Sequence, residues 1–193
     1  MIACLDLEGV LLPEIWIKFA EKTGVEKLKL TTRDIPDYDE LMTKRLNILK
    51  ENNFKLSDIK EVISKLEPLD GAIEFHKWLR SEFEVIILSD TFYQFVSPLM
   101  QKLDYPTLFC HQLVIDTNDS IVGYKLRQPN GKQEAVKALQ NLNFKVVAAG
   151  DSYNDIGMLK QANEGILFDP PENVISDYPQ FSVSMSYVDF QKK

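Results

Sequence analysis

Histidine and cysteine are scarce in this sequence of 193 residues, which contains only two of each. His76 and His111 give a histidine-based catalytic triad or a histidine-rich metal site little to work with. Cys4 and Cys110 lie in apolar runs far apart in the sequence and lack the spacing of a zinc site. We therefore expect two buried free thiols in a reducing compartment.

Long apolar runs and an excess of positive charge are also missing. No run approaches the roughly 18 apolar residues of a membrane span, and Asp6 comes too early for the apolar part of a signal peptide. The 29 acidic residues outnumber the 22 basic ones, and the net charge of −7 disfavours nucleic acids and anionic membranes as partners. We expect a cytoplasmic protein with small-molecule partners, in which a phosphorylated substrate needs a locally positive pocket.

The N-terminal stretch is the one around which we interpret the rest of the sequence. An apolar run, residues 2–5, ends at two carboxylates, Asp6 and Glu8, which Gly9 follows. This pattern is typical of a buried strand that delivers acidic side chains to the edge of a sheet. We interpret Asp6 as a nucleophile and Glu8 as its acid/base partner, with a metal ion nearby because two adjacent carboxylates repel. The alternative left open is a strand followed by two solvated loop acids.

Helical periodicity dominates the segment after this strand, and no strand is legible between residues 11 and 82. We expect a helical cap domain of residues 12–70, inserted into an α/β core domain of residues 1–11 and 71–193. Within the cap, a loop at 31–36 leads to Asp37, a candidate helix N-cap. Arg45 falls on the apolar stripe of the helix that follows, where it either covers apolar surface with its stem or meets an anion.

Two further predicted strands end in polar residues. Residues 85–88 precede Ser89 and Asp90, where we expect a helix to begin with its N–H groups open to an anion. Simple helix capping is the alternative for these two side chains. Residues 146–149 form the other strand, and the polar residues after it are Asp151, Asn154 and Asp155.

The remaining segments complete the predicted architecture. Residues 113–115 and 121–126 flank a turn like the arms of an antiparallel hairpin, and residues 165–168 read as a fourth buried strand. Lys132 stands where a helix begins, although the helix dipole favours acids there, so it is either held for an anion or a solvated loop lysine. The whole pattern predicts an α/β fold with an open, mostly parallel, doubly wound, Rossmann-like sheet.

In such a sheet the carboxyl ends of the strands share one edge, so the polar residues after them converge on a crevice. The residues expected there are Asp6, Glu8, Ser89, Asp90, Lys132, Asp151, Asn154 and Asp155. A carboxylate nucleophile beside a hard divalent cation held by oxygens fits phosphoryl transfer, and Mg²⁺ suits this ligand set.

These residues resemble, in order, the four motifs of the haloacid dehalogenase-like superfamily of aspartyl-phosphate enzymes. The motifs are residues 6–10, Ser89, Lys132 and residues 150–155. The helical insertion, with Glu14 and Arg45, resembles that of the phosphoserine phosphatase branch. Over nearly the whole chain the sequence is similar to members of that branch that also transfer the phosphoryl group from phosphoserine to homoserine. The resemblance implies Mg²⁺-dependent phosphoserine hydrolysis and transfer to homoserine.

The resemblance also implies a role for each residue of the site. Asp6 would be the phosphorylated nucleophile and Glu8 the acid/base. Mg²⁺ would be bound by Asp6, Asp151 and the backbone carbonyl of Glu8. Ser89 and Lys132 would bind the phosphoryl group, and Asn154 would contact the phosphate or position a ligand. Asp155 would orient Lys132 or a metal-bound water. Glu14 would recognise the substrate ammonium, and Arg45 would recognise its carboxylate.

Two positions depart from ordinary phosphoserine phosphatases, since Glu8 replaces an aspartate, and Asp90 and Thr91 replace glycines. The extra methylene of Glu8 suits an acceptor hydroxyl larger than water, and Asp90 offers a carboxylate to the ammonium of that acceptor. The alternatives are a phosphatase of the same superfamily for another small phosphomonoester, an idle binding protein and a non-enzymatic receiver-like module. Receivers lack both the second acid and the cap. The oligomeric state stays open between a monomer and a homodimer.

Overall fold

The computed structural model describes residues 1–32, 34–35 and 37–193. Its sheet has seven strands in the order β4-β3-β2-β1-β5-β6-β7, with an antiparallel β3–β4 pair and five parallel pairs. The strands are β1 (Ile2–Leu5), β2 (Glu84–Phe92), β3 (Thr107–Ile115), β4 (Ile121–Lys125), β5 (Val146–Gly150), β6 (Glu164–Phe168) and β7 (Ser182–Ser184). This confirms the predicted α/β class, the mostly parallel sheet and the hairpin.

The central strand β1 contributes side chains to two separate apolar cores. Ala3 and Leu5 belong to the larger core, whereas Ile2 and Cys4 belong to the smaller one. Because successive side chains of a strand point to opposite faces, the sheet must be covered on both sides. An apolar strand that is buried on both faces therefore delivers its last residues to the edge of the sheet, where the acidic residues follow.

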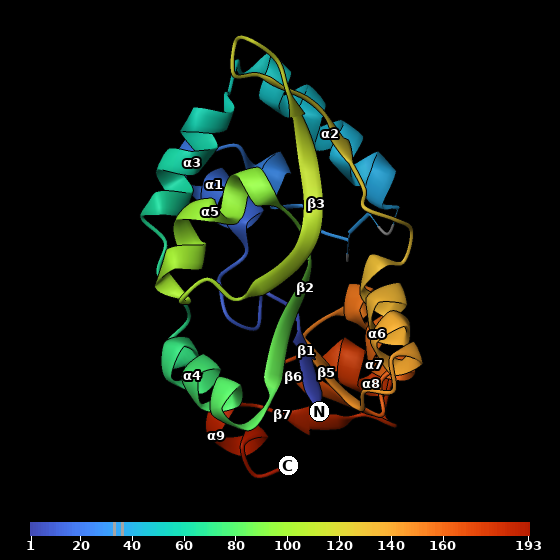
Figure 1. Cartoon of the computed structure of the whole chain (residues 1–193). Helices are drawn as coiled ribbons and strands as arrows, with labels where there is room; N and C mark the ends of the chain where they lie inside the picture. Colours follow the sequence, from blue (N-terminus) through green and yellow to red (C-terminus); the bar gives the residue numbers. More distant parts are fainter. Residues whose placement is uncertain (33, 36) are drawn as a thin grey trace.

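Helices provide this cover (Figure 1). Helices α6, α7 and α8 pack over the smaller core, and α4 and α9 over the larger one. Helices α1, α2, α3 and α5 gather at one end of the molecule, and both termini lie at the other end. The helices are α1 (Ile15–Thr23), the 3₁₀ helix η1 (Glu26–Lys29), α2 (Tyr38–Glu51), α3 (Leu56–Ser64), α4 (Ala72–Glu82), α5 (Tyr93–Lys102), α6 (Gly131–Asn141), the 3₁₀ helix η2 (Tyr153–Asp155), α7 (Ile156–Gln161), α8 (Glu172–Asp177) and α9 (Tyr187–Phe190).

The segment with α1, η1, α2 and α3 leaves the sheet and returns to it at one place. The backbone N–H of Leu69 donates to the carbonyl of Leu11 at 3.0 Å, so the two ends of the excursion are joined. The turn between β3 and β4 reaches the far side of the same segment. There the Asp119 carboxylate accepts from the backbone N–H of Ser57 at 2.9 Å, in the first turn of α3. The helical segment is thus fixed to the sheet at two points.

Two element boundaries differ from the sequence-based prediction. The expected helix start at Ser89 is wrong, because β2 continues to Phe92 and α5 begins at Tyr93. The pairing of β2 with β3 is irregular between Leu88 and Phe92, the stretch that contains Ser89 and Asp90. Strand β3 starts at Thr107 rather than at residue 113, since its first half pairs in parallel with β2 and lacks a simple alternating pattern.

The cap of α2 and the two cysteines agree with the sequence-based prediction. Asp37 is the N-cap of α2, and its carboxylate accepts from the Glu40 backbone N–H at 2.8 Å. Residues 33 and 36 of the predicted loop 31–36 lie outside the described residues. Cys4 and Cys110 are buried free thiols, and burial raises the pKa of each to about 12. Within the described part of the chain, no helix is long and apolar enough to cross a membrane.

Candidate active site

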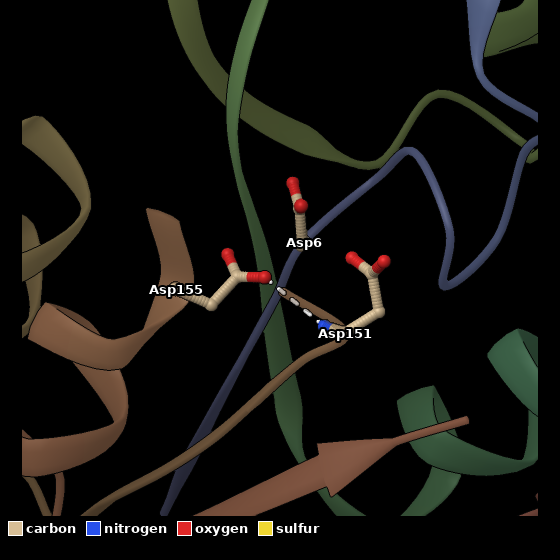
Figure 2. Close-up of side chains that lie close together, drawn as sticks. All are labelled: Asp6, Asp151 and Asp155. Atoms are coloured by element: carbon tan, nitrogen blue, oxygen red, sulfur yellow. Dashed lines mark hydrogen bonds between the residues drawn. The ribbon is translucent and has the colours of Figure 1, made fainter. Parts of the chain in front are cut away.

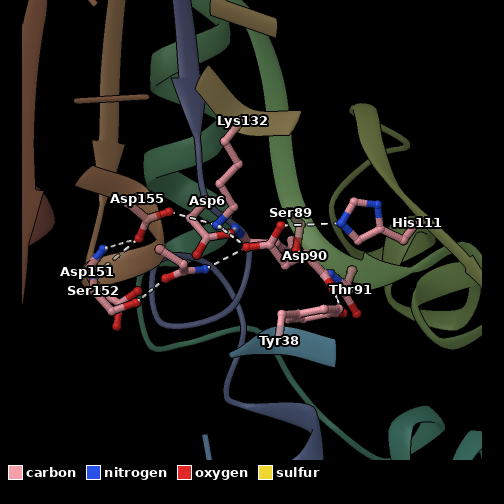
Figure 3. Close-up of polar contacts among 12 residues, drawn as sticks. Asp6, Tyr38, Ser89, Asp90, Thr91, His111, Lys132, Asp151, Ser152 and Asp155 are labelled. Atoms are coloured by element: carbon pink, nitrogen blue, oxygen red, sulfur yellow. Dashed lines mark hydrogen bonds and ion pairs between the residues drawn. The ribbon is translucent and has the colours of Figure 1, made fainter. Parts of the chain in front are cut away.

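Side chains from four parts of the chain meet at the carboxyl edge of the sheet (Figure 3). Asp6 follows β1, Ser89 and Asp90 lie within β2, Asp151 follows β5, and Lys132 belongs to the first turn of α6. With the exception of Asp90, whose side chain is 32% exposed, each of these residues is at most 6% exposed. The site is therefore a buried polar cluster at the end of an apolar sheet.

Three buried carboxylates form the centre of the cluster. Asp6, Asp151 and Asp155 each present an oxygen within 4.8 Å of the others (Figure 2). Gly9 permits this approach, because its φ is +82° and a Cβ atom there would lie 2.6 Å from the carboxyl carbon of Asp151. Carboxylates this close repel one another unless a cation lies among them. Oxygen ligands of this kind are those that a hard divalent cation prefers.

Asp155 is held in place by the backbone of the loop after β5. One carboxylate oxygen accepts from the N–H of Asp151 at 3.0 Å and from that of Ser152 at 3.2 Å. Gly150 leaves the room for this arrangement, since a Cβ atom there would lie 2.2 Å from the Asp155 carboxyl carbon. The other oxygen accepts from Lys132 Nζ at 2.7 Å. Asp155 thus connects the loop after β5 to Lys132.

Lys132 brings a positive charge to these acids. Its Nζ lies 2.7 Å from Asp155 Oδ1, 3.0 Å from Asp6 Oδ1 and 3.5 Å from Asp90 Oδ2. Burial alone lowers the pKa of a lysine, but the three carboxylates outweigh it and raise the pKa of Lys132 well above its ordinary value. The lysine therefore stays charged, which explains a cation at a helix N-terminus against the preference of the helix dipole.

The pKa of Asp6 indicates that the cluster would be stabilised by further positive charge. Burial raises the pKa of Asp6 well above its ordinary value, and the charges of Asp155, Asp151 and Asp90 add to this, while Lys132 opposes it. A carboxylate acts as a nucleophile only in its ionised form. A divalent cation among these oxygens would lower the pKa of Asp6 and complete the charge balance, so the donor set fits such an ion.

Glu8 is fixed to the start of α1. Its Oε2 accepts from the backbone N–H of Ile15 at 3.0 Å. Burial raises the pKa of Glu8, although the hydrogen bonds from Ile15 and Thr91 and the charge of Arg45 oppose the shift. A raised pKa makes a carboxyl group a weaker acid that retains its proton to a higher pH, which favours a role as general acid.

Glu14 and Arg45 line the same cavity of about 80 Å³ as Asp6 and Glu8. Arg45 is 7% exposed, its guanidinium lies 4.5 Å from the centre of the Trp16 ring, and its Nη2 donates to a backbone carbonyl of the loop after η1 at 2.9 Å. Its Nε has no hydrogen-bond partner among the described residues. Burial lowers the pKa of Arg45 to about 10, although its neighbours Tyr38, Glu8 and Glu14 oppose the shift. Arg45 thus both packs on an aromatic ring and faces the cavity.

Ser89, Asp90 and Asn154 form the side of the cavity next to Lys132. Ser89 Oγ accepts from the Thr91 N–H at 3.3 Å, and Asn154 Nδ2 donates to Asp90 Oδ2 at 2.8 Å. Burial raises the pKa of Asp90, but the charge of Lys132 and the hydrogen bonds from His111 and Asn154 outweigh it, so the net pKa is lowered. Asp90 is a carboxylate at neutral pH.

Tyr38, His111 and Trp16 also contact this site and were not among the residues predicted from the sequence. Tyr38, the first residue of α2, donates its hydroxyl to the Asp90 carbonyl at 2.9 Å. His111 in β3 lies against the Asp90 carboxylate, and Trp16 in α1 lies under the guanidinium of Arg45. Each contact joins elements far apart in the sequence, so no local spacing pointed to it. A lone histidine next to a buried cysteine was the only available signal for His111.

The sequence and the fold of this chain are similar to those of known proteins. A family model described as haloacid dehalogenase-like hydrolase matches residues 2–163. The chain is 60% identical over 192 residues to the phosphoserine phosphatase ThrH of Pseudomonas aeruginosa, covering 100% of this chain and 94% of that protein. It is 57% identical over 192 residues to the phosphoserine phosphatase of Pseudomonas syringae pv. tomato, covering 100% and 81%. A crystal structure of phosphoserine phosphatase in apo form has a TM-score of 0.81 at 21% identity, covering 99% and 97%, and shares the fold.

Proposed function

Since the chain belongs to the haloacid dehalogenase-like hydrolase family, we propose that it is a Mg²⁺-dependent phosphoserine phosphatase with an aspartyl-phosphate intermediate on Asp6. One observation carries the choice of substrate. Glu14 and Arg45 line the cavity that also contains Asp6, so a carboxylate and a guanidinium flank the proposed phosphoryl site. A phosphorylated amino acid has the ammonium and the carboxylate that match this pair. Relatives 60% and 57% identical carry the name phosphoserine phosphatase.

The reaction we propose has two steps. In the first, an oxygen of Asp6 attacks the phosphorus, the bond to the serine oxygen breaks, and Glu8 gives its proton to that oxygen. In the second, Glu8 takes a proton from a water whose oxygen attacks the phosphorus, which releases phosphate and restores the Asp6 carboxylate. Lys132 and Ser89 hold the equatorial phosphoryl oxygens throughout.

The metal is Mg²⁺ in this proposal, held by Asp6, Asp151 and the backbone carbonyl of Glu8. When bound, the ion offsets the repulsion between the acids and the charge of the phosphoryl oxygens. Asp155, which holds Lys132, is the third carboxylate of the cluster and remains a supporting residue.

The helical segment between β1 and α4 accounts for one side of this cavity. We propose that residues 12–70 form a cap domain over a core of residues 1–11 and 71–193, supported by the hydrogen bond from Leu69 to Leu11 that joins its two ends. Glu14 and Arg45 come from the cap segment and Asp6 from the core, so closure of one part on the other would shield the phosphoryl group from water.

A panel of phosphomonoesters tests this function. Phosphate release would be measured with Mg²⁺, and with a chelator, from phosphoserine, phosphoethanolamine, a sugar phosphate and a nucleotide. We expect phosphoserine to have the highest kcat/KM and the chelator to abolish release. Preference for the sugar phosphate or nucleotide would support the alternative of a different phosphatase in the family. No release from any ester would support an idle binding protein or a receiver-like module.

We further propose transfer of the phosphoryl group to homoserine. In-line attack places an acceptor hydroxyl where the serine oxygen left, so the acceptor occupies the same cavity, with its carboxylate at Arg45 and its ammonium near Glu14 and Asp90. A carboxylate offers about four acceptor sites, so Asp90 can accept an ammonium in addition to its present neighbours. These groups belong to one chain, and a homodimer would carry two such sites.

Phosphorus NMR tests the transfer half of the proposal. A mixture of protein, Mg²⁺, phosphoserine and excess homoserine should give a phosphohomoserine resonance besides inorganic phosphate. Glu8→Asp, which withdraws the carboxyl group by one methylene, should shift the balance toward hydrolysis. Phosphate as the sole product at every homoserine concentration would refute transfer and leave hydrolysis standing.

A further inference from the structure

A buried histidine stands behind the site and has no part in the mechanism above. His111 belongs to β3, is 6% exposed, and places its Nε2 3.4 Å from Asp90 Oδ1. Its Nδ1 accepts from the backbone N–H of Arg127 at 3.2 Å. A nitrogen that accepts a hydrogen bond carries a lone pair, so in the neutral imidazole the proton is on Nε2. The ring therefore donates toward Asp90.

The imidazole is held on its other sides by aromatic rings. Tyr38 lies edge-on with its ring centre 6.3 Å from that of His111, and Phe92 lies 6.4 Å away. Tyr38 also donates its hydroxyl to the Asp90 carbonyl at 2.9 Å. Tyr38 therefore contacts both the ring of His111 and the backbone of Asp90. With these two held in place, the group whose orientation His111 can determine is the Asp90 carboxylate.

Asp90 connects this histidine to the reacting groups. Its Oδ2 accepts from Asn154 Nδ2 at 2.8 Å and lies 3.5 Å from Lys132 Nζ, and that Nζ lies 3.0 Å from Asp6 Oδ1 (Figure 3). Oδ1 of Asp90 faces His111, and Oδ2 faces the lysine. Released from His111, the Asp90 carboxylate could turn both oxygens toward Lys132 and compete with Asp6 and the phosphoryl oxygens for it.

We propose that His111 is a positioning residue for phosphoryl transfer, which keeps the Asp90 carboxylate turned so that Lys132 stays directed at Asp6 and the phosphoryl group. The effect on turnover rests on the proposed phosphatase function. Loss of the Nε2–H donor then lowers kcat, while KM for phosphoserine changes little because Glu14 and Arg45 on the cap segment are untouched.

Two matched variants separate this role from packing. His111→Gln carries an amide N–H that reaches as far as imidazole Nε2, whereas His111→Asn ends where Nδ1 lies and has no donor for Asp90. We expect His111→Asn to lower kcat about tenfold, as for one hydrogen bond to a charged group, with KM within about twofold. His111→Gln should recover most of kcat. Equal losses in both variants, or full activity of His111→Asn, would overturn the proposal.

A second measurement does not depend on turnover. Nitrogen NMR of the imidazole in the resting wild-type protein should show the Nε2–H tautomer, and Asp90→Asn should shift the Nε2 resonance. A proton on Nδ1, or an Nε2 resonance indifferent to Asp90→Asn, would overturn the inference whatever the substrate. Wild-type protein that releases no phosphate from phosphoserine, yet shows the predicted tautomer and shift, would instead refute the proposed function alone.

Discussion

Lys132 Nζ lies 3.0 Å from Asp6 Oδ1, and both side chains are 6% exposed. Because three carboxylates surround this one ammonium, its removal leaves buried charges without compensation. We expect Lys132→Met to lower kcat by at least about 100-fold and the free energy of unfolding by about 3–5 kcal/mol. Steady-state kinetics and urea unfolding measure the two effects.

The control for this variant lies on the same helix. Lys137 is 54% exposed and pairs with Glu134 at 3.6 Å, and Lys137→Met should change the free energy of unfolding by less than about 0.5 kcal/mol. If Lys132→Met were as stable and active as this control, the ion-pair account of the site would be wrong.

Arg45→Ala should weaken recognition of the substrate carboxylate. Loss of a charge-assisted pair in a closed pocket costs about 2–4 kcal/mol of binding, so KM should rise far more for phosphoserine than for phosphoethanolamine, which lacks the carboxylate. Lys44→Ala, on the exposed side of the same helix, controls for changes to α2. Equal losses on both substrates would mean that Arg45 serves the packing on Trp16 instead.

Two glycines form a matched pair for testing the metal site. Gly9 and Gly24 both have positive φ, at +82° and +73°, but an added Cβ meets the Asp151 carboxylate at Gly9 and nothing within 4 Å at Gly24. Both substitutions to alanine should lower stability by about 1–3 kcal/mol through backbone strain, and the contact with Asp151 adds to the loss at Gly9. Gly9→Ala alone should raise the Mg²⁺ concentration needed for half-maximal activity. If both variants needed the same Mg²⁺ concentration for half-maximal activity, Asp151 would not be a ligand of the metal.

His76 should make stability depend on pH. It is 2% exposed, its Nε2 has no hydrogen-bond partner among the described residues, and burial, followed by the charge of Arg80, lowers its pKa below 6.5. The folded state thus binds this proton less readily than the unfolded state. The contribution of neutral His76 to the free energy of unfolding is therefore complete above the pKa of His76 in the unfolded chain, about 6.5. It is lost as the pH falls toward the pKa of His76 in the folded protein, by at most about 1.4 kcal/mol per pH unit.

His76→Gln removes this titration and gives the comparison. Urea unfolding at pH 7.5, 6.5 and 5.5 should show the variant gaining stability relative to wild type as the pH falls. A difference that stays constant over this range would show that His76 does not titrate differently on folding.

The sequence predicted the parts of this fold that depend on local pattern. Strand β1 and the acids after it follow from an apolar run that stops at Asp6, and the hairpin follows from turn residues between two largely apolar segments. The register between β2 and β3 was not predictable in this way. The irregular pairing there, with Ser89 in a strand rather than at a helix start, joins segments that are not adjacent in the sequence.

The same division applies to the candidate site. Residues that interrupt a pattern, such as Lys132 at a helix start and Arg45 on an apolar stripe, were found because their positions conflict with local preference. Tyr38 and His111 conflict with nothing nearby in the sequence. They reach Asp90 across 52 and 21 residues respectively, and only the folded chain brings them together.

Asp6 carries the phosphoryl group in the proposed reaction, and every other proposed role in the site follows from this one. The direct measurement is rapid acid quench of the protein with Mg²⁺ and phosphoserine, followed by mass spectrometry of its peptides. We expect one phosphoryl group on the N-terminal peptide at Asp6 in the wild type, and neither phosphorylation nor turnover in Asp6→Asn, since an amide cannot attack phosphorus. A phosphoryl group on another residue, or undiminished turnover in Asp6→Asn, would contradict the account.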